Sequence, residues 1–326
     1  MTRAFWPWVR LLAGAGILAV LLWRLGTDAF LDGLRVIDVP TLAAALGLGL
    51  LTTVCSAWRW CLVARGMGIG LPLGAAVADY YRSLFLNAAL PGGVLGDVHR
   101  AVRHGQEVGD VGRGVRAVVM ERFAGQVALV AVGAVVLLTL PSPVLSGLRP
   151  VTTPWTVLAV LVAAAAAAGL LAWWAVRRPG SWWGRTSRAT LADVRSGLLA
   201  RGVWPGIAVS SVVVLAGHLA TFLLAARAAG SAAPVTRLAP LLLLALLAMA
   251  VPTNIGGWGP REGAAAWAFG AAGLGAAQGL TTSVVYGVLA FAASLPGVVV
   301  LVLRRAERRR AASAGADGQA RQPARV

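Results

Sequence analysis

The dominant pattern along the chain is a series of long apolar stretches separated by short polar ones. An α-helix needs about 20 apolar residues to cross a bilayer. The stretches of that length predict spans at about Val9–Leu25, Thr41–Val63, Ala117–Leu140, Pro154–Val176, Trp204–Arg227 and Thr281–Leu303. The first resembles a signal peptide, but no small-residue cleavage site follows Leu25, so we expect a retained span.

Two other apolar segments run into helix-breaking sequences. Leu73–Leu90 ends in LPGGVLGD, and the short Leu238–Val251 ends in VPTNIGGWGP. Each is followed by a second, more polar helical stretch, at Val98–His104 and Arg261–Ala277. The pattern predicts two re-entrant, broken helices, whose breaks are formed by Pro91, Gly92, Gly93, Gly96, Pro252, Gly256, Gly257 and Gly259.

Composition places the chain among integral membrane proteins. The chain is 58% apolar and 13% charged, with a mean hydropathy of +0.77, whereas soluble domains have roughly 45–50% apolar and about 25% charged residues. These values exclude a soluble enzyme, a disordered protein and a secreted disulfide scaffold. Cys55 and Cys61 point to different helix faces and offer neither a disulfide framework nor a metal-ligand spacing.

The net charge of +17 comes from arginine alone, because the sequence contains no lysine. Arginine gathers in cytoplasmic loops, which puts the N-terminus, the loop 177–203 and the tail after Leu303 inside, and the loops 26–40 and 141–153 outside. Every loop obeys this rule only if both broken segments enter and return on one side. We therefore expect six full spans plus two re-entrant helices in the cell membrane, with both termini cytoplasmic. No basic soluble domain is present to bind nucleic acid.

The two broken segments share a spaced motif. The spacing P-x4-G-x3-R occurs at Pro91, Gly96 and Arg100, and again 161 residues later at Pro252, Gly257 and Arg261. The expected fold class is an all-α polytopic membrane protein with two inverted-topology repeats, about 9–140 and about 154–303, in one transmembrane domain (1–305) before a disordered basic tail (306–326). Inverted repeats with broken helices are typical of transporters. The alternative is that the breaks only let helices pack closely.

Arg100 and Arg261 are the leading candidates for substrate binding. Each lies in the first turn of a half-helix, where the helix dipole is already positive, so the position is unfavourable unless an anion is bound. The planar guanidinium suits a phosphate diester or a carboxylate. The alternative is an internal salt bridge, between Arg261 and Glu262 and between Arg100 and Asp97 or Glu121.

Other polar residues extend the candidate substrate-binding set. Glu121-Arg122 gates the site, pairs with Arg100, or forms an interfacial ion pair. Glu262 either couples a proton or pairs with its neighbour. Asn87 and Asn254 flank the breaks and can cap freed backbone groups or bind a headgroup.

Two further polar residues have simpler interpretations. Arg59 is expected to snorkel to the cytoplasmic interface between two tryptophans, and His218 to form a helix–helix hydrogen bond. Motifs for metal, nucleotide or acyl-transfer chemistry do not occur in the sequence, so we expect no catalytic residue, metal or cofactor.

Four segments carry a resemblance to a known family: SAWRWCLVARGMG, LFLNAALPGGVLGDVHRA, VVMERFAG and VPTNIGGWGPREGAA. Over about residues 10–305 the chain resembles the lysylphosphatidylglycerol synthase transmembrane-region family, the flippase-like domain of multiple-peptide-resistance proteins and their stand-alone relatives. The most specific piece comprises Pro252, Asn254, Gly256, Gly257, Gly259, Arg261 and Glu262. At Trp258-Gly259-Pro260 the chain departs from the small or aliphatic run that is usual in the family. This departure affects the expected shape of the turn, but not the Arg261-Glu262 pair.

The resemblance implies movement of a lipid between leaflets, in some relatives an aminoacylated phosphatidylglycerol. Two-part relatives continue into a soluble aminoacyl-transferase domain, and here a short arginine-rich tail stands in that place, so we expect a separate lipid-modifying enzyme to supply the lipid. The expected partner is a membrane phospholipid or polyprenyl-phosphate lipid. The sequence leaves open whether copies of the chain form a homo-oligomer.

The leading functional hypothesis is a passive or ion-coupled translocase for a lipid with an anionic or zwitterionic headgroup. One alternative is a membrane-embedded transferase that acts on a polyprenyl-phosphate or phospholipid, with Glu121 or Glu262 as the general base. Another is a non-catalytic membrane scaffold that binds partners through the loop 177–203 or the tail.

Overall fold

The computed structural model describes residues 35–90, 93–140, 182–249 and 258–304, and every regular element there is an α-helix. In chain order the helices are α3 (Val39–Gly66), α4 (Leu73–Ala89), α5 (Leu95–Val108), α6 (Val111–Thr139), α9 (Trp182–Gly197), α10 (Trp204–Ala228), α11 (Val235–Met249), α12 (Pro260–Ala271) and α13 (Ala276–Ser294). The predicted spans Val9–Leu25 and Pro154–Val176 lie outside the described residues, as do Pro91, Gly92, Pro252, Asn254, Gly256 and Gly257.

Within the described residues, four helices have the length and apolarity to cross a membrane: Val39–Gly66, Val111–Leu137, Trp204–Ala228 and Ala276–Arg304. They match four of the predicted spans and confirm an all-helical membrane protein. The first of them begins at Asp38, whose carboxylate accepts a 2.9 Å hydrogen bond from the Thr41 backbone N–H. Hydrogen bonds from Thr41 hold the pKa of Asp38 below its usual value.

Both predicted breaks separate pairs of short helices. α4 ends at Ala89, close to the expected Leu90, and α5 begins at Leu95, three residues before the expected Val98. The second pair deviates more, because α12 ends at Ala271 and not at the predicted Ala277. Gly273 and Gly275 adopt φ of 71° and 91°, a left-handed backbone that ends the helix and turns the chain into α13.

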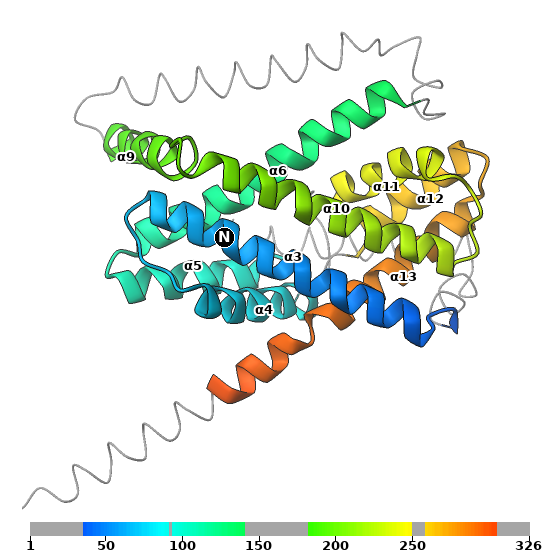
Figure 1. The fold of residues 1–326 in the computed structure, drawn as a ribbon, viewed down its shortest axis with the longest axis horizontal. Helices are drawn as coiled ribbons and strands as arrows, with labels where there is room; N and C mark the ends of the chain where they lie inside the picture. The colour runs from blue at the N-terminus through cyan, green and yellow to red at the C-terminus, as the bar shows by residue number, and fades with distance from the viewer. Residues whose placement is uncertain (1–34, 91–92, 141–181, 250–257, 305–326) are drawn as a thin grey trace, which may run out of the picture.

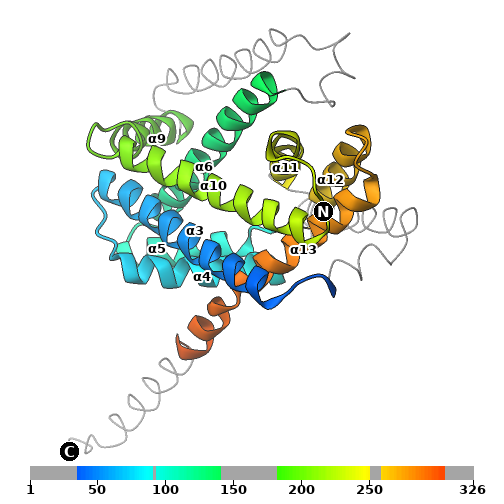
Figure 2. The same ribbon diagram turned by 45° about the vertical axis from the view of Figure 1, so that its right-hand side comes forward.

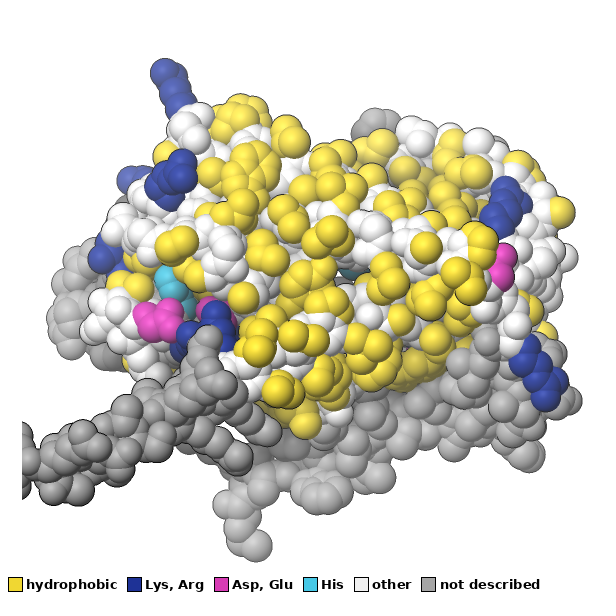
Figure 3. Space-filling model, turned by 60° about the horizontal axis from the view of Figure 1, so that its bottom comes forward, with side chains coloured by type: hydrophobic (Ala, Val, Ile, Leu, Met, Phe, Trp, Pro, Cys, Tyr) yellow, Lys and Arg dark blue, Asp and Glu magenta, His cyan; other side chains and the backbone are white. Residues whose placement is uncertain are grey.

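The helices form an elongated bundle. α3 and α10 pack along each other, and the α4–α5 pair and the α11–α12 pair lie toward opposite ends of the molecule in both ribbon views (Figures 1 and 2). Hydrophobic side chains cover the middle of the face in Figure 3, and the charged side chains visible there gather toward its two ends. This distribution is the one expected of a protein surrounded by lipid.

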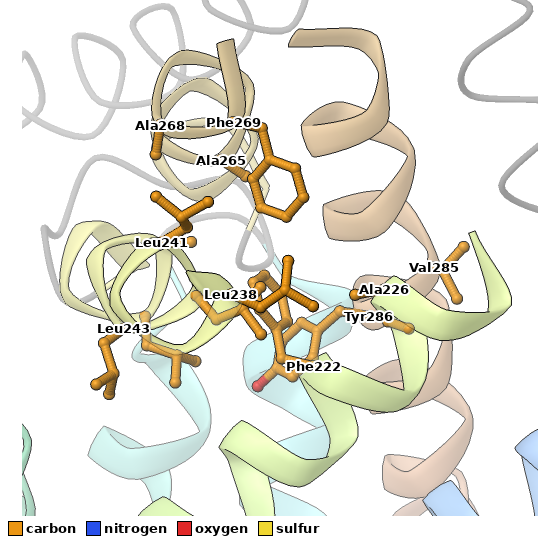
Figure 4. Packing of buried hydrophobic residues seen from close by; sticks show 14 of the residues in the cluster. Phe222, Ala226, Leu238, Leu241, Leu243, Ala265, Ala268, Phe269, Val285 and Tyr286 are labelled. Atoms are coloured by element: carbon orange, nitrogen blue, oxygen red, sulfur yellow. The ribbon is translucent and has the colours of Figure 1, made fainter. Parts of the chain in front are cut away.

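The largest hydrophobic core lies where α10, α11, α12 and α13 meet. The rings of Phe222 and Tyr286 pack edge to face with centroids 4.2 Å apart, and Leu238, Leu241 and Phe269 are completely buried around them (Figure 4). This core fixes the second helix pair against the helix that follows it, and thereby positions the side chains at the start of α12.

The first helix pair is held together by a close backbone approach at Gly96. A Cβ atom on Gly96 would lie 2.1 Å from the carbonyl oxygen of Ser83 in α4, and backbone oxygen cannot yield as a flexible side chain can. Glycine is therefore required here for packing, since no larger residue lets α5 approach α4 this closely.

Gly96→Ala is expected to destabilise the protein by about 1–3 kcal/mol, the usual cost of inserting a methyl group into a packed interface. The midpoint of unfolding in detergent micelles measures the effect. Gly74→Ala is the matched control, because a Cβ on Gly74 of α4 would meet no atom within 4 Å. Equal midpoints for the two variants would contradict the packing role of Gly96.

Candidate functional site

A cavity of about 600 Å³ lies between the two helix pairs and the long helices that flank them. Its wall is mostly apolar, with side chains such as Val94, Val118 and Leu289. The chief polar groups of the wall come from five helices, α4, α5, α6, α10 and α12, and they are Asn87, Asp97, Arg122, Gln126, His218 and Arg261. An apolar pocket of this size with a few convergent polar groups is typical of a ligand site.

Glu121 is the centre of a charge network beside the cavity. Its carboxylate is completely buried and accepts hydrogen bonds from Arg59 of α3, at 2.6 and 3.1 Å, and from Arg100 of α5, at 3.0 Å. The Tyr80 hydroxyl of α4 donates a further hydrogen bond of 3.2 Å to the same carboxylate. One carboxylate of α6 thus ties together three neighbouring helices.

Asp97 is the second carboxylate of this network, and it lines the cavity. It accepts hydrogen bonds from Arg122 at 2.7 Å, Arg100 at 3.2 Å, Ser83 at 2.8 Å and Asn87 at 2.9 Å. The Asn87 side-chain oxygen also accepts the Gly96 N–H, at 2.8 Å. Asn87 therefore caps a backbone group freed by the break, one of its two predicted roles, while it also lines the cavity.

Arg100 and Arg122 differ in their access to the cavity. Arg100 is 1% exposed, and its guanidinium lies between the rings of Trp60 and Tyr80, at 4.5 and 4.3 Å from their centroids. It stands behind the cavity wall and pairs with the two carboxylates, as the salt-bridge alternative predicted. The side chain of Arg122 is 39% exposed and belongs to the wall. The arginine of this half that can meet a ligand directly is thus Arg122.

Arg261 and Glu262 form the corresponding charged pair at the start of α12. Arg261 donates to Glu262 through Nε at 2.9 Å and through Nη2 at 2.5 Å, and to Ser283 of α13 through Nε at 3.0 Å. Glu262 in turn accepts the Gly259 N–H at 2.7 Å, which caps the helix. Gly259 has φ of 111°, a conformation that favours glycine.

Arg261 is 3% exposed, and its guanidinium belongs to the cavity wall together with two aromatic rings. The guanidinium lies 5.2 Å from the centroid of the Trp258 ring and 5.0 Å from that of Tyr286, and all three side chains line the cavity. In the described part of the chain its Nη1 group has no hydrogen-bond partner. Glu262, in contrast, is completely buried and is not part of the wall.

The structure corrects one sequence expectation and confirms another. Arg59 does not snorkel to the interface: it is 4% exposed and donates to Glu121 and to Ser211 of α10. Its position a full turn inside the predicted span was the available signal, but the partner carboxylate is 62 residues away. His218 forms the predicted helix–helix hydrogen bond, at 3.1 Å between its Nδ1 and the Tyr286 hydroxyl.

The fold and this site define a helical membrane protein with a cavity, lined in part by charged side chains, between two pairs of short helices. The chain belongs to the family described as the lysylphosphatidylglycerol synthase TM region, whose family model matches residues 8–297. No curated protein matches the chain. The match covers both helix pairs and the whole cavity, so the family assignment applies to the site as well as to the fold.

Proposed function

We propose that this protein is a lipid translocase, which moves a phospholipid or another phosphate-bearing lipid between the leaflets of the cell membrane. The observation that carries the proposal is the cavity itself, whose mostly apolar wall includes Arg122 of α6 and Arg261 of α12. A lipid headgroup needs a polar site inside the membrane, and guanidinium groups are well suited to bind its phosphate.

The charges around the cavity favour an anionic or zwitterionic headgroup. Four guanidinium groups, of Arg59, Arg100, Arg122 and Arg261, stand against the three carboxylates of Asp97, Glu121 and Glu262. Because Arg261 and Glu262 neutralise each other, the excess of one positive charge belongs to the network around Glu121 and Asp97, whose Arg122 lies on the cavity wall. An excess charge within a membrane costs roughly 2.5–3.5 kcal/mol even on lenient scales, and a bound phosphate diester would neutralise it.

The proposed inverted repeat favours transport between leaflets. Adding the motif offset of 161 residues to α4, Leu73–Ala89, gives 234–250, close to α11, Val235–Met249. The contacts repeat as well: α5 packs on α6 as α12 packs on α13, and α4 packs on α13 as α11 packs on α6. In transporters with such repeats, the substrate binds near the bilayer midplane at the repeat interface.

The arginines of the two halves also occupy equivalent surroundings. Arg100 bonds to Glu121 on the helix that follows its own pair, and Arg261 bonds to Ser283 on the helix that follows its own pair. The similar surroundings of Arg100 and Arg261, together with the arginine distribution of the loops, favour a topology of six full spans and two re-entrant helices, with both termini cytoplasmic.

The geometry does not favour the transferase alternative. Its proposed general bases, Glu121 and Glu262, are completely buried and engaged in ion pairs, whereas a general base must reach the proton that it removes. The scaffold alternative makes a different prediction, namely that the arginines of the cavity wall are dispensable.

Arg122→Ala is expected to slow leaflet transfer about ten- to a hundredfold, the loss of one charge-assisted hydrogen bond to the headgroup. The protein is reconstituted into vesicles that contain fluorescently labelled phosphatidylglycerol or, in parallel, phosphatidylcholine. A membrane-impermeant quencher then reports how fast label from the inner leaflet reaches the outer one. The variant should fold, since Asp97 keeps its hydrogen bonds from Arg100, Ser83 and Asn87.

The matched control is Arg201→Ala, which removes an exposed arginine from the turn before α10 and should transfer lipid at the rate of the unaltered protein. Transfer by the unaltered protein no faster than in protein-free vesicles, for both lipids, would exclude passive translocation of these lipids. Unchanged transfer by Arg122→Ala would remove Arg122 from the binding site and favour the scaffold.

A further inference from the structure

The last membrane-length helix contains a proline break. α13 ends at Ser294, a turn follows at Leu295, and the helix resumes over residues 296–304. Pro296 begins the resumed segment, where it has no N–H to continue the hydrogen-bond ladder of α13. Figure 1 shows the ribbon interrupted between α13 and the orange-red segment beyond it. Leu295 keeps helical dihedral angles, so the chain continues through the interruption, and proline is one of the few features at which long helices bend.

The segment 296–304 packs against α4 next to the cavity. A Cβ atom on Gly297 would lie 2.3 Å from the carbonyl oxygen of Tyr81 and 2.8 Å from the Cβ of Phe85, so the two helices are in backbone contact. At the edge of the cavity the rings of Phe85 and Phe291 meet, with centroids 6.3 Å apart. These contacts form one continuous seam, which we call the α4–α13 seam.

An ion pair closes the far end of this seam. Arg304 donates a 2.7 Å hydrogen bond to Asp79 of α4, although the two residues are 225 positions apart in sequence. Asp79 is 5% exposed, and the same carboxylate oxygen lies 3.2 Å from Arg82 and 3.5 Å from Arg103. Arg304 is the member of this cluster that comes from beyond the hinge.

The order of residues along both helices places the seam at one end of the cavity. On α4, Ala88 and Leu84 line the cavity, Tyr81 lies in the seam and Asp79 forms the ion pair. On the other side, Ser294 lines the cavity, and Gly297 and Arg304 follow in the same order. Opening the seam would expose the cavity to the side of the membrane on which α4 begins.

The corresponding contact of the other half is looser. Where α6 packs on α11, a Cβ atom on Gly133 would meet only the side chain of Leu247, at 3.2 Å. A flexible leucine side chain can move, whereas the backbone contact at Gly297 leaves no such freedom. Of these two glycine contacts, the one at Gly297 is the contact with backbone.

We propose that the segment 296–304 is a gate, which is hinged at Pro296 and held closed by the ion pair between Arg304 and Asp79. The gate serves the translocase proposed above and in that sense rests on it. Its opening and closing are a property of the protein alone, however, and can be measured without any lipid substrate.

The experiment measures access to the cavity through a cysteine at position 294. In a background with Cys55→Ala and Cys61→Ala, Ser294→Cys is labelled by a membrane-impermeant thiol reagent, applied in separate vesicle preparations to each side of the membrane. Arg304→Gln removes the ion pair across the seam but leaves Asp79 with Arg82 and Arg103. We expect labelling from the α4 side to accelerate about five- to thirtyfold, the effect of losing one or two kcal/mol of closing energy.

A second variant opens the seam by a different mechanism. Gly297→Ala inserts a methyl group against the backbone of α4 and should accelerate the same labelling, whereas the matched control Gly74→Ala should not. Arg304→Lys keeps the positive charge and should label more slowly than Arg304→Gln.

Labelling of both seam variants at the rate of the parent protein would overturn the gate, as would acceleration from the opposite side only. If Gly297→Ala does not fold, the comparison between Arg304→Gln and Arg304→Lys still decides. Slow lipid transfer by a protein whose labelling responds as expected would count against the translocase and leave the gate intact.

Discussion

Glu121→Ala is expected to destabilise the protein by about 3–5 kcal/mol, the cost of removing one partner from a buried ion pair. The carboxylate of Glu121 is completely buried, and it serves Arg59 and Arg100, whose side chains are themselves at most 5% exposed. Without Glu121, the guanidinium groups of Arg59 and Arg100 stay buried. The remaining carboxylate of the network is that of Asp97, which pairs with Arg100 and Arg122. The midpoint of unfolding in mixed detergent micelles should fall accordingly.

Glu107→Gln is the control for this prediction, because it also removes one carboxylate from an arginine partner. The Glu107 side chain is 49% exposed and pairs with Arg103 one turn earlier on α5. Such a surface pair contributes about 0.3–0.5 kcal/mol. A loss below about 1 kcal/mol for Glu121→Ala would mean that the network around it is not structural.

Arg261→Gln is expected to slow leaflet transfer about ten- to a hundredfold, because Arg261 is the cavity-lining arginine of the second half. The same change leaves Glu262 buried and without its cation, so the variant also loses stability. A single substitution cannot separate the two effects, and a second variant is therefore needed.

The double variant Arg261→Gln, Glu262→Gln separates headgroup binding from folding. It removes both charges, keeps an amide oxygen to accept the Gly259 N–H, and should recover most of the lost stability. If Arg261 binds the headgroup, transfer stays slow although the protein is stable again. Recovery of transfer together with stability would instead show that Arg261 acts only by holding the fold.

Much of the helix layout follows from the sequence, because membrane-length apolar runs are a strong signal. The predicted span Trp204–Arg227 differs from α10 by a single residue at its end. The second broken helix was less predictable: nothing in the apolar pattern distinguishes Ala271 from Ala277 as the end of α12, and the positive φ of Gly273 decides it.

The candidate site was predictable in part. The sequence singles out both half-helix arginines because a charge next to a membrane break is unusual. Which arginine faces the cavity depends on how α5 and α6 are rotated about their axes. In the folded protein that rotation buries Arg100 between Trp60 and Tyr80 and turns Arg122 toward the cavity.

The sequence by itself determined the membrane-embedded helical class, the family resemblance, the positions of the two breaks and the residue types beside them, since all of these are local in the chain. Only the tertiary structure decided which charges neutralise one another, because the partners are distant: Arg59 meets Glu121 across 62 residues, and Arg304 meets Asp79 across 225. A carboxylate within the membrane is costly unless it is paired with a cation. Which cation lies close enough depends on how the helices pack, and that packing is a property of the whole fold.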